Sequence, residues 1–320
     1  MTTHIPTLNI SQFINGSPTQ KTEFAKNLGK SFEEIGFAVL SGHPISLEKQ
    51  QNAYRVINDF FQLPVEAKKK YEVAGIGGAR GYTGFGKEHA KDSKVGDLKE
   101  FFHIGIDLPK GHPQETHPDF PPNVSVKELP EFDPTLKDLW KDLYQLSQHV
   151  LSAIAIHLDL PANWFHQYTE FGNHVLRPIH YPPLTGNETP KAIRAGAHED
   201  INLITLLIGA SNPGLQAKNR KGEWVSITAK PSEIVINAGD MLQRLTNRQF
   251  VSTTHQVVNP EHKTGAKSET RFSVPFFVHP ISEMNLEALP QCVSASNPVK
   301  DPPILAGDFL NQRLREIGLK

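Results

Sequence analysis

The sequence predicts an α+β protein in which a helical N-terminal third precedes a core built mainly from β-strands. Two observations lead to this prediction. Before about residue 170, apolar side chains recur at helical spacing, whereas after Val175 short β-branched or alternating runs follow one another with turn signals between them. Many short strands without intervening helices favour a β-sandwich or barrel over a parallel α/β sheet.

The composition limits the classes of protein to which the chain can belong. Its 320 residues have a formal net charge of −1, so no basic surface for nucleic acid is expected. It has no run of 18 apolar residues, and its N-terminus lacks the basic and apolar stretches of a secretory signal. The single cysteine, Cys292, excludes a disulfide framework. We therefore expect a cytoplasmic enzyme or binding module without nucleic-acid or membrane partners.

The first third is predicted to contain two helices around a strand. Phe24, Leu28 and Phe32 mark one face of the first helix. Residues 37–40 are expected to form a short buried strand, and Ser46 is a suitable N-cap for the second helix.

Other segments before and after the β region have separate predictions. Residues 75–86 are rich in glycine but lack the Gly-Lys-Ser/Thr ending of a phosphate-binding loop, so we expect a surface or active-site loop. Residues 107–134 resemble a connector, and Asp133 is expected to cap a long helix over 135–158. The apolar stripe of that helix is predicted to consist of Leu139, Leu143, Leu146, Val150 and Ile154. A last helix is expected over 307–317.

The β region is predicted to contain seven strands. They are 175–181, 201–208, 214–217, 224–227, 233–237, 251–258 and 271–278.

Three His-x-Asp pairs occur in the chain, at 117–119, 157–159 and 198–200. The first lies in the proline-rich connector, and the second ends the long helix, where residues two apart do not face each other. The third opens a strand-like run, in which alternation places residues two apart on the same side. We therefore expect His198 and Asp200 to point into one cavity.

A third metal ligand is expected from another strand-like run, which contains His255. Two histidines and one carboxylate form the facial triad of non-haem Fe(II) enzymes, which leaves coordination positions open for dioxygen and substrate. A ligand set without thiolate is not typical of a structural zinc site. The predicted metal ligands are therefore His198, Asp200 and His255.

Arg271 and Ser273 form a candidate carboxylate site on the last predicted strand. Two residues apart, they share a face, and the guanidinium and hydroxyl groups can both donate to one carboxylate. A buried arginine beside an apolar run is costly unless it meets an anion.

With these motifs identified, the sequence resembles the 2-oxoglutarate/Fe(II)-dependent dioxygenases of the isopenicillin N synthase-like family. The resemblance rests on residues 198–207, 271–277 and 179–183, and extends over nearly the whole chain. It implies a double-stranded β-helix (jelly roll) with surrounding helices. The divisions it implies are an N-terminal mixed region over 1–125, linking helices over 126–170, a jelly-roll core over 171–285 and a C-terminal tail and helix over 286–320.

The resemblance also implies an activity and its site. Fe(II) would be the metal, 2-oxoglutarate the co-substrate and O2 the oxidant in hydroxylating, desaturating or cyclising a small organic substrate, with succinate and CO2 as products. Arg271 and Ser273 would hold the far carboxylate of 2-oxoglutarate, assisted by Tyr181. The substrate would be bound by side chains of the N-terminal region and the last strand, namely Arg80, Tyr82, Phe102 and Phe276.

Two alternatives remain at this point. Isopenicillin N synthase itself has a similar iron strand and Arg-x-Ser pair but uses the pair to hold its peptide substrate, so an Fe(II) oxidase without 2-oxoglutarate is one alternative. The other is a non-catalytic β-barrel protein that binds a small acid or a metal. The sequence predicts neither the substrate nor the oligomeric state.

Overall fold

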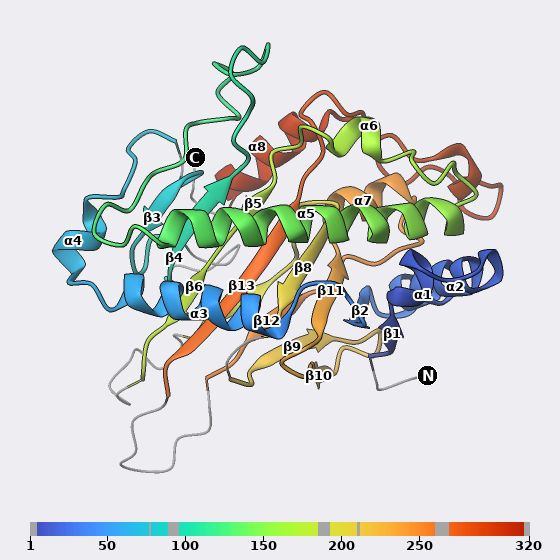
Figure 1. Ribbon diagram of the computed structural model, residues 1–320. Helices are drawn as coiled ribbons and strands as arrows, with labels where there is room; N and C mark the ends of the chain where they lie inside the picture. The colour runs from blue at the N-terminus through green and yellow to red at the C-terminus, as the bar shows by residue number, and fades with distance from the viewer. Residues whose placement is uncertain are drawn as a thin grey trace.

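The computed structural model describes residues 5–76, 78–88, 96–184, 193–209, 212–259 and 269–316. Within these ranges the chain forms a nine-stranded and a four-stranded sheet, with helices covering the large sheet (Figure 1). The predicted mainly β core with a helical N-terminal third is therefore confirmed.

The helices of the described chain are α1 Ser11–Ile14, α2 Pro18–Glu34, α3 Leu47–Phe61, α4 Val65–Lys69, α5 Phe132–His157, α6 His166–Thr169, α7 Asp240–Leu245 and α8 Ala306–Glu316, with a 3-10 turn at Pro290–Cys292. The strands are β1 Thr7–Asn9, β2 Phe37–Ser41, β3 Gly81–Thr83, β4 Glu100–Gly105, β5 Val175–Leu176, β6 Ile179–Tyr181, β7 Ala195–His198, β8 Ile204–Ile208, β9 Leu215–Lys218, β10 Trp224–Ser226, β11 Ile234–Ala238, β12 His255–Val257 and β13 Arg271–Val278.

The large sheet combines strands from both halves of the chain. Its order is β1-β2-β11-β8-β13-β5-β4-β3, and β6 pairs with β13 and β4. The small sheet has the order β10-β9-β12-β7. Apart from the parallel pair β1–β2, the described strand pairs are antiparallel. The N-terminal strands thus complete both ends of a sheet whose centre comes from the second half of the chain.

Helix α5 is the principal cover of the large sheet. It packs against α2, α3, β8 and β13, and Figure 1 shows it in green across the strands. Its predicted apolar stripe is fully buried and consists of Leu139, Leu143, Leu146, Val150 and Ile154. The helical period in the sequence therefore predicted which face of this helix enters the core.

The opposite face of the large sheet packs against the small sheet. Phe37 and Val39 of β2 and Val235 of β11 form one buried cluster with Ala217 of β9 and Val257 of β12. Successive side chains of a strand point to opposite faces of a sheet, so β2 and β11 each contribute some residues to this cluster and others to the core under the helices. The inner face of the sandwich is the one that can present side chains to an enclosed site.

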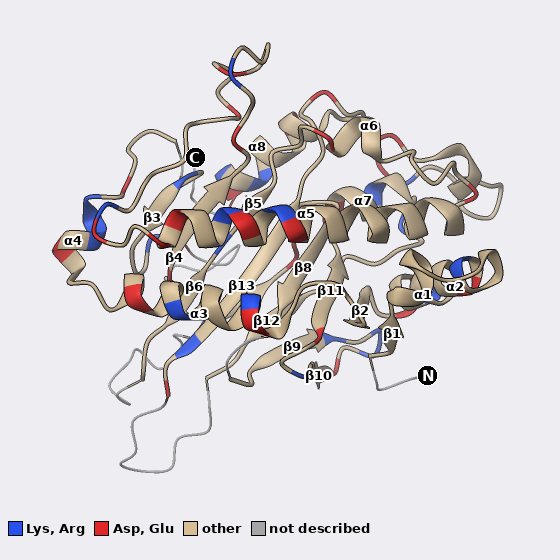
Figure 2. Cartoon of the chain, viewed as in Figure 1, with Lys and Arg blue, Asp and Glu red and all other residues tan. Residues whose placement is uncertain are grey.

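Charged residues of both signs are interspersed along α3, α4 and α5 on the face shown in Figure 2. This distribution agrees with the net charge of −1. Within the described ranges, no helix combines the length and the apolar character that crossing a membrane requires.

The predicted helix caps had different outcomes. Ser46 caps α3 as expected, since its side chain accepts a hydrogen bond from the backbone N–H of Lys49 at 3.1 Å. Helix α5 instead begins at Phe132, so Asp133 lies inside its first turn and is not its cap. The Asp133 carboxylate accepts a bond from the N–H of Val126 at 3.4 Å.

Several predicted strands are shorter in the structure. The run 175–181 divides into β5 and β6 around Pro178, which has no N–H for a strand ladder. The runs 201–208 and 251–258 contribute only Ile204–Ile208 and His255–Val257. Helix α7 was not predicted, because residues 238–240 have the composition of a turn. The last residue of the predicted C-terminal helix, 317, lies outside the described ranges.

Candidate metal centre

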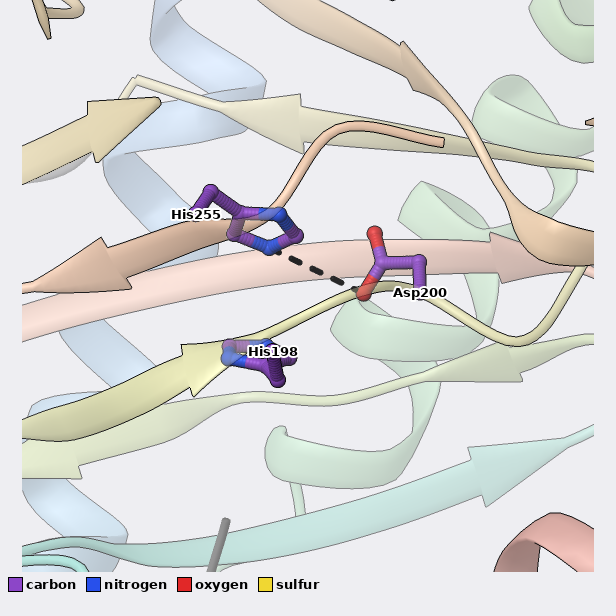
Figure 3. Close-up of side chains that lie close together, drawn as sticks. All are labelled: His198, Asp200 and His255. Atoms are coloured by element: carbon purple, nitrogen blue, oxygen red, sulfur yellow. Dashed lines mark ion pairs between the residues drawn. The ribbon is translucent and has the colours of Figure 1, made fainter. Parts of the chain in front are cut away.

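Three side chains from separate parts of the chain converge at the inner edge of the small sheet. His198 ends β7, Asp200 follows it, and His255 begins β12. One ligand atom from each lies within 4.8 Å of the other two (Figure 3). The Nε2 atom of His255 is 3.8 Å from an Asp200 carboxylate oxygen.

Strand register brings the two histidines together, but the alternation of side chains along a strand does not explain the position of Asp200. His198 and His255 are direct partners in the antiparallel pair β7–β12. Asp200 is not on that strand, because residues 199–203 form the connection by which the chain passes from the small sheet to β8 of the large sheet. The expected convergence is present, whereas the expected reason, two residues on one strand, was wrong.

Backbone hydrogen bonds orient both imidazoles. The Nδ1 atom of His198 lies 2.7 Å from the carbonyl oxygen of Gly196, and that of His255 lies 3.1 Å from the carbonyl oxygen of Thr253. A donating Nδ1–H leaves the Nε2 lone pair of each ring available to a metal. The ring of Phe37 packs edge-on against His255 and fixes that ring further.

The carboxylate of Asp200 is held through one of its two oxygens. Its Oδ2 atom accepts hydrogen bonds from the Thr205 hydroxyl at 2.6 Å and the Asn237 amide at 2.7 Å. The Oδ1 atom is the one that faces His255. One oxygen is therefore anchored while the other is directed at the histidines.

The electrostatics of the centre favour the protonation states that bind a metal. Burial raises the pKa of Asp200, but the adjacent His255 and His198 and the bonds to Oδ2 outweigh it, so this pKa lies below its ordinary value. Burial, and then the neighbouring His255, lower the pKa of His198 to about 4. A neutral imidazole and an ionised carboxylate are the forms that coordinate metals. The donor set of two imidazole nitrogens and one carboxylate oxygen fits Fe(II).

A cavity of about 860 Å³ adjoins this centre and is bordered by His198 and Asp200. Its wall also contains several charged or titratable side chains, namely Arg80, Glu88, Asp97, Lys99, His103 and Arg177. Such a volume is within the range that small-molecule sites occupy.

Arg271, Ser273 and Tyr181 lie together on the neighbouring strands β13 and β6. Arg271 is the register partner of Tyr181, and its guanidinium carbon lies 4.9 Å from the centre of the tyrosine ring. Its Nε atom donates to the carbonyl oxygen of Asn212, while the buried Nη1 atom has no hydrogen-bond partner in the described chain. A buried guanidinium with an unused donor, beside the buried Ser273, fits a carboxylate ligand. These three residues are not among those bordering the large cavity.

A second buried arginine lies nearby and was not singled out from the sequence. Arg194 is 2% exposed, and its Nη2 atom donates to the carbonyl oxygen of Glu269. Burial, and then the charge of Arg271, lower the pKa of Arg194. Arg194 immediately precedes β7, which begins at Ala195 and ends at His198, so strand alternation in the sequence does not single it out.

The four predicted substrate-binding residues have different positions. Arg80 borders the cavity, although it is fully buried and donates to the carbonyl oxygen of Ala79. Tyr82, Phe102 and Phe276 lie in the core on the helix side of the large sheet.

The expectation for these three aromatic residues is therefore corrected. Tyr82 donates its hydroxyl to Glu100, Phe102 packs against Phe60, and Phe276 packs against Trp140. These side chains do not reach the cavity because successive residues of a strand point to opposite faces of the sheet, so a position one residue away faces the other side. The neighbours on the inner face, His103 and Phe277, are the ones that border the cavity.

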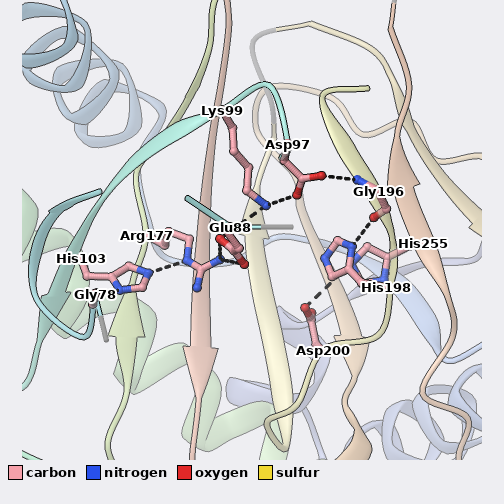
Figure 4. Close-up of polar contacts among 10 residues, drawn as sticks. All are labelled: Gly78, Glu88, Asp97, Lys99, His103, Arg177, Gly196, His198, Asp200 and His255. Carbon is pink, nitrogen blue, oxygen red and sulfur yellow. Dashed lines mark hydrogen bonds and ion pairs between the residues drawn. The ribbon is translucent and has the colours of Figure 1, made fainter. Parts of the chain in front are cut away.

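A polar network along the cavity wall was also not assigned from the sequence. Arg177 donates to both His103 and Glu88, and Lys99 and Asp97 extend the network toward His198 (Figure 4). No local motif connects these residues, since Glu88 and Arg177 are 89 positions apart.

Comparisons with known proteins agree with this geometry. Residues 5–128 match the family described as non-haem dioxygenase in morphine synthesis N-terminal, and residues 172–280 match the 2OG-Fe(II) oxygenase superfamily. The chain is 30% identical to the 2-oxoglutarate-Fe(II) type oxidoreductase hxnY of Emericella nidulans, over 95% of this chain and 88% of that protein.

Two solved structures are similar over almost the full length. A 2OG-Fe(II) oxygenase family protein from Caulobacter crescentus has 43% identity and a TM-score of 0.86, covering 99% of this chain and 100% of that one. Neurospora crassa T7H in complex with alpha-KG and thymine has 31% identity and a TM-score of 0.84, covering 97% and 96%.

Proposed function

The chain belongs to the 2OG-Fe(II) oxygenase superfamily, and from this premise we propose which of its residues carry out the reaction. Its fold is the jelly roll of that family, with helices around it. The protein is an oxidoreductase that uses Fe(II), 2-oxoglutarate and O2. The relatives favour this activity over both the oxidase without 2-oxoglutarate and the non-catalytic binding protein.

We propose that His198, Asp200 and His255 hold the iron. Their convergence within 4.8 Å, the two oriented Nε2 atoms and the anchored carboxylate support this assignment. When bound, Fe(II) activates O2 together with 2-oxoglutarate, which is converted to succinate and CO2 as the substrate is oxidised. The protein contributes by fixing ligand geometry, so that the reactants meet in one orientation.

The far carboxylate of 2-oxoglutarate is assigned to Arg271 and Ser273, with Tyr181 beside them. The unused buried donor of Arg271 supports this role, because a carboxylate would satisfy it. Arg194 adds a second buried cation beside Arg271. These groups orient the co-substrate and exclude water from its far end.

The substrate is assigned to the cavity of about 860 Å³ beside His198 and Asp200. Its size suits a small organic molecule, and the similarity to N. crassa T7H, whose structure holds thymine, supports that class. Hydroxylation of a C–H bond is the proposed outcome. Desaturation or ring closure would require only a different placement of the same substrate.

The observation on which this function depends is the juxtaposition of His198, Asp200 and His255. We would supply the purified protein with Fe(II), ascorbate and 2-oxoglutarate in air and measure succinate, and measure metal binding anaerobically by calorimetry. Wild-type protein should form succinate, whereas Asp200→Ala and His255→Ala should lose both metal binding and succinate. Unchanged metal binding in both variants would contradict the assignment.

A further inference from the structure

We propose that Glu88, His103 and Arg177 form a substrate-recognition site for an uncharged planar molecule whose edge presents an N–H beside a C=O group, as in a cyclic amide, imide or urea. This inference rests on the proposed function, because it assigns the substrate class of the same cavity. It begins with the position of the three side chains. All three border the cavity that His198 and Asp200 also border (Figure 4).

The guanidinium of Arg177 is held in one orientation. Its central carbon lies 4.6 Å from the ring centre of Phe101 and 4.9 Å from that of Phe277. Its Nε atom donates to Nε2 of His103, whose Nδ1 atom lies 2.6 Å from the carbonyl oxygen of Gly78. A guanidinium fixed between two rings and one acceptor is preorganised for a ligand.

His103 acts in this arrangement as a neutral acceptor. Burial, and then the charge of Arg177, lower the pKa of His103 well below its ordinary value. Its Nδ1–H donates to Gly78, which leaves Nε2 unprotonated to accept from Arg177. The imidazole therefore orients the guanidinium without adding a charge to the cavity wall.

Glu88 supplies the acceptor beside this donor. Its two carboxylate oxygens accept from Nη1 of Arg177 at 3.3 and 3.4 Å, and Nζ of Lys99 is 3.6 Å away. These contacts are longer than the roughly 2.7–2.9 Å of a tight charged hydrogen bond, so the carboxylate retains capacity for a ligand donor. Burial raises the pKa of Glu88, but Arg177 and Lys99 outweigh it and hold this pKa well below its ordinary value.

The cations of this wall are matched by carboxylates. Arg177 pairs with Glu88, and Lys99 pairs with Asp97 at 2.8 Å. A ligand with a net charge would have to disrupt one of these buried ion pairs, which is costly. An uncharged N–H/C=O edge can instead donate to Glu88 and accept from Nη2 of Arg177, an atom with no hydrogen bond inside the described chain.

Two further arginines border the cavity, and their terminal nitrogens are already engaged within the protein. Arg313 pairs with Asp240 at 2.8 Å and with Glu316 at 2.9 Å. The other is Arg80. Its side chain is 0% exposed, and its guanidinium lies against the backbone of Gly105. Its terminal nitrogens donate to the carbonyl oxygen of Ala79 and, at 3.4 Å, to the amide oxygen of Asn173.

The recognition wall is connected to the metal centre through Asp97. One Asp97 oxygen accepts from Lys99, and the other accepts from the N–H of Gly196 at 3.0 Å. The carbonyl oxygen of Gly196 is the partner of Nδ1 of His198. A ligand held by Glu88 and Arg177 is thereby positioned relative to a metal ligand through the Glu88–Lys99 ion pair and the hydrogen bonds that follow it.

The test uses three ring-matched probes on the protein loaded anaerobically with Fe(II) and 2-oxoglutarate. Uracil presents the N–H/C=O edge, 1,3-dimethyluracil lacks both N–H donors, and orotate adds a carboxylate. Calorimetry should show that wild-type protein binds uracil about tenfold or more tightly than either analogue. Equal binding of uracil and 1,3-dimethyluracil, or tighter binding of orotate, would overturn the inference.

Glu88→Gln tests the role of charge directly. It retains the size of the side chain and leaves the wall with one excess positive charge, so uracil should bind about tenfold more weakly and orotate more tightly than in wild type. Glu223→Gln, the same chemical change in the turn between β9 and β10, should leave all three affinities unchanged. An unaltered uracil-to-orotate ratio in Glu88→Gln would overturn the inference. If this variant does not fold, the comparison of the three probes on wild-type protein still tests the proposed substrate class.

The failure of this inference differs from the failure of the proposed function. If wild-type protein binds Fe(II) and 2-oxoglutarate and forms succinate, but does not distinguish the probes, only the substrate class is wrong. If it neither binds 2-oxoglutarate nor forms succinate, the proposed function and this inference both fail.

Discussion

His198 and His255 are direct register partners across the antiparallel strands β7 and β12, and the centres of their rings lie 4.4 Å apart. The positions of these two candidate metal ligands are thus fixed by the backbone pairing of two strands, which is rigid. The third donor, Asp200, lies on an irregular connection and depends on side-chain hydrogen bonds for its position. Perturbing those bonds should therefore affect the metal centre without unfolding the sheet.

Replacing Thr205 by valine should weaken Fe(II) binding about ten- to a hundred-fold, because the hydroxyl holds Oδ2 of Asp200 at 2.6 Å. Anaerobic calorimetry would measure the affinity. The matched control is Thr246→Val, another buried threonine, whose hydroxyl donates to the carbonyl oxygen of Leu242 away from the centre. Equal Fe(II) affinities for the two variants would contradict the proposed anchoring of Asp200.

Replacing Arg271 by glutamine should weaken 2-oxoglutarate binding about ten- to a hundred-fold while Fe(II) binding persists, since charged hydrogen bonds to the far carboxylate are lost. The KM for 2-oxoglutarate in the succinate assay reports this change. Arg248→Gln, which removes an exposed arginine paired with Asp301, is the control and should leave that KM unchanged. An unaltered KM in Arg271→Gln would show that another group holds the co-substrate.

His174 should make the protein less stable in acid. It is fully buried with Nε2 at 2.7 Å from the carbonyl oxygen of Thr169, and burial lowers its pKa to about 4. As pH falls below about 6.5, His174 becomes protonated in the unfolded state but stays neutral in the folded state. The free energy of unfolding therefore decreases as pH falls to about 4. The loss from this residue is about 2 kcal/mol at pH 5.

Urea unfolding at about pH 7.5 and pH 5 would measure this effect in wild type and in His174→Gln, whose side chain does not titrate. The difference in unfolding free energy between the two pH values should be about 2 kcal/mol smaller in the variant. An identical pH dependence would mean that His174 is not the group responsible.

Replacing Phe60 by alanine should lower the free energy of unfolding by about 3–5 kcal/mol, because a large buried ring leaves a cavity. Phe60 is 0% exposed, and its ring centre lies 5.0 Å from that of Phe132 and 5.1 Å from that of Phe102. Urea unfolding would measure the loss. Val65→Ala, at an exposed position nearby, should cost no more than about 0.5 kcal/mol, and a similar cost for both variants would refute this packing role.

The predicted faces of the strands show how far local patterns can be applied. Arg271 and Ser273 were placed on one face of a strand, and alternation along the same strand puts Phe277 on that face and Phe276 on the other. The structure agrees, with Phe277 at the cavity and Phe276 in the core. The sequence alone therefore places Phe277, and not Phe276, on the same face of the strand as Arg271.

The amino-acid sequence alone determined the chemistry that is available and the elements with a strong local period. The donor types of His198, Asp200 and His255, the buried stripe of α5 and the bounds of β13 all follow from side-chain type and spacing. Tertiary structure decided where distant segments meet. The passage between sheets that aims Asp200 at the two histidines, and the pairing of Glu88 with Arg177 across 89 positions, depend on strand register and on chain crossings. Such contacts form through collective packing, for which neighbouring residues provide no local signal.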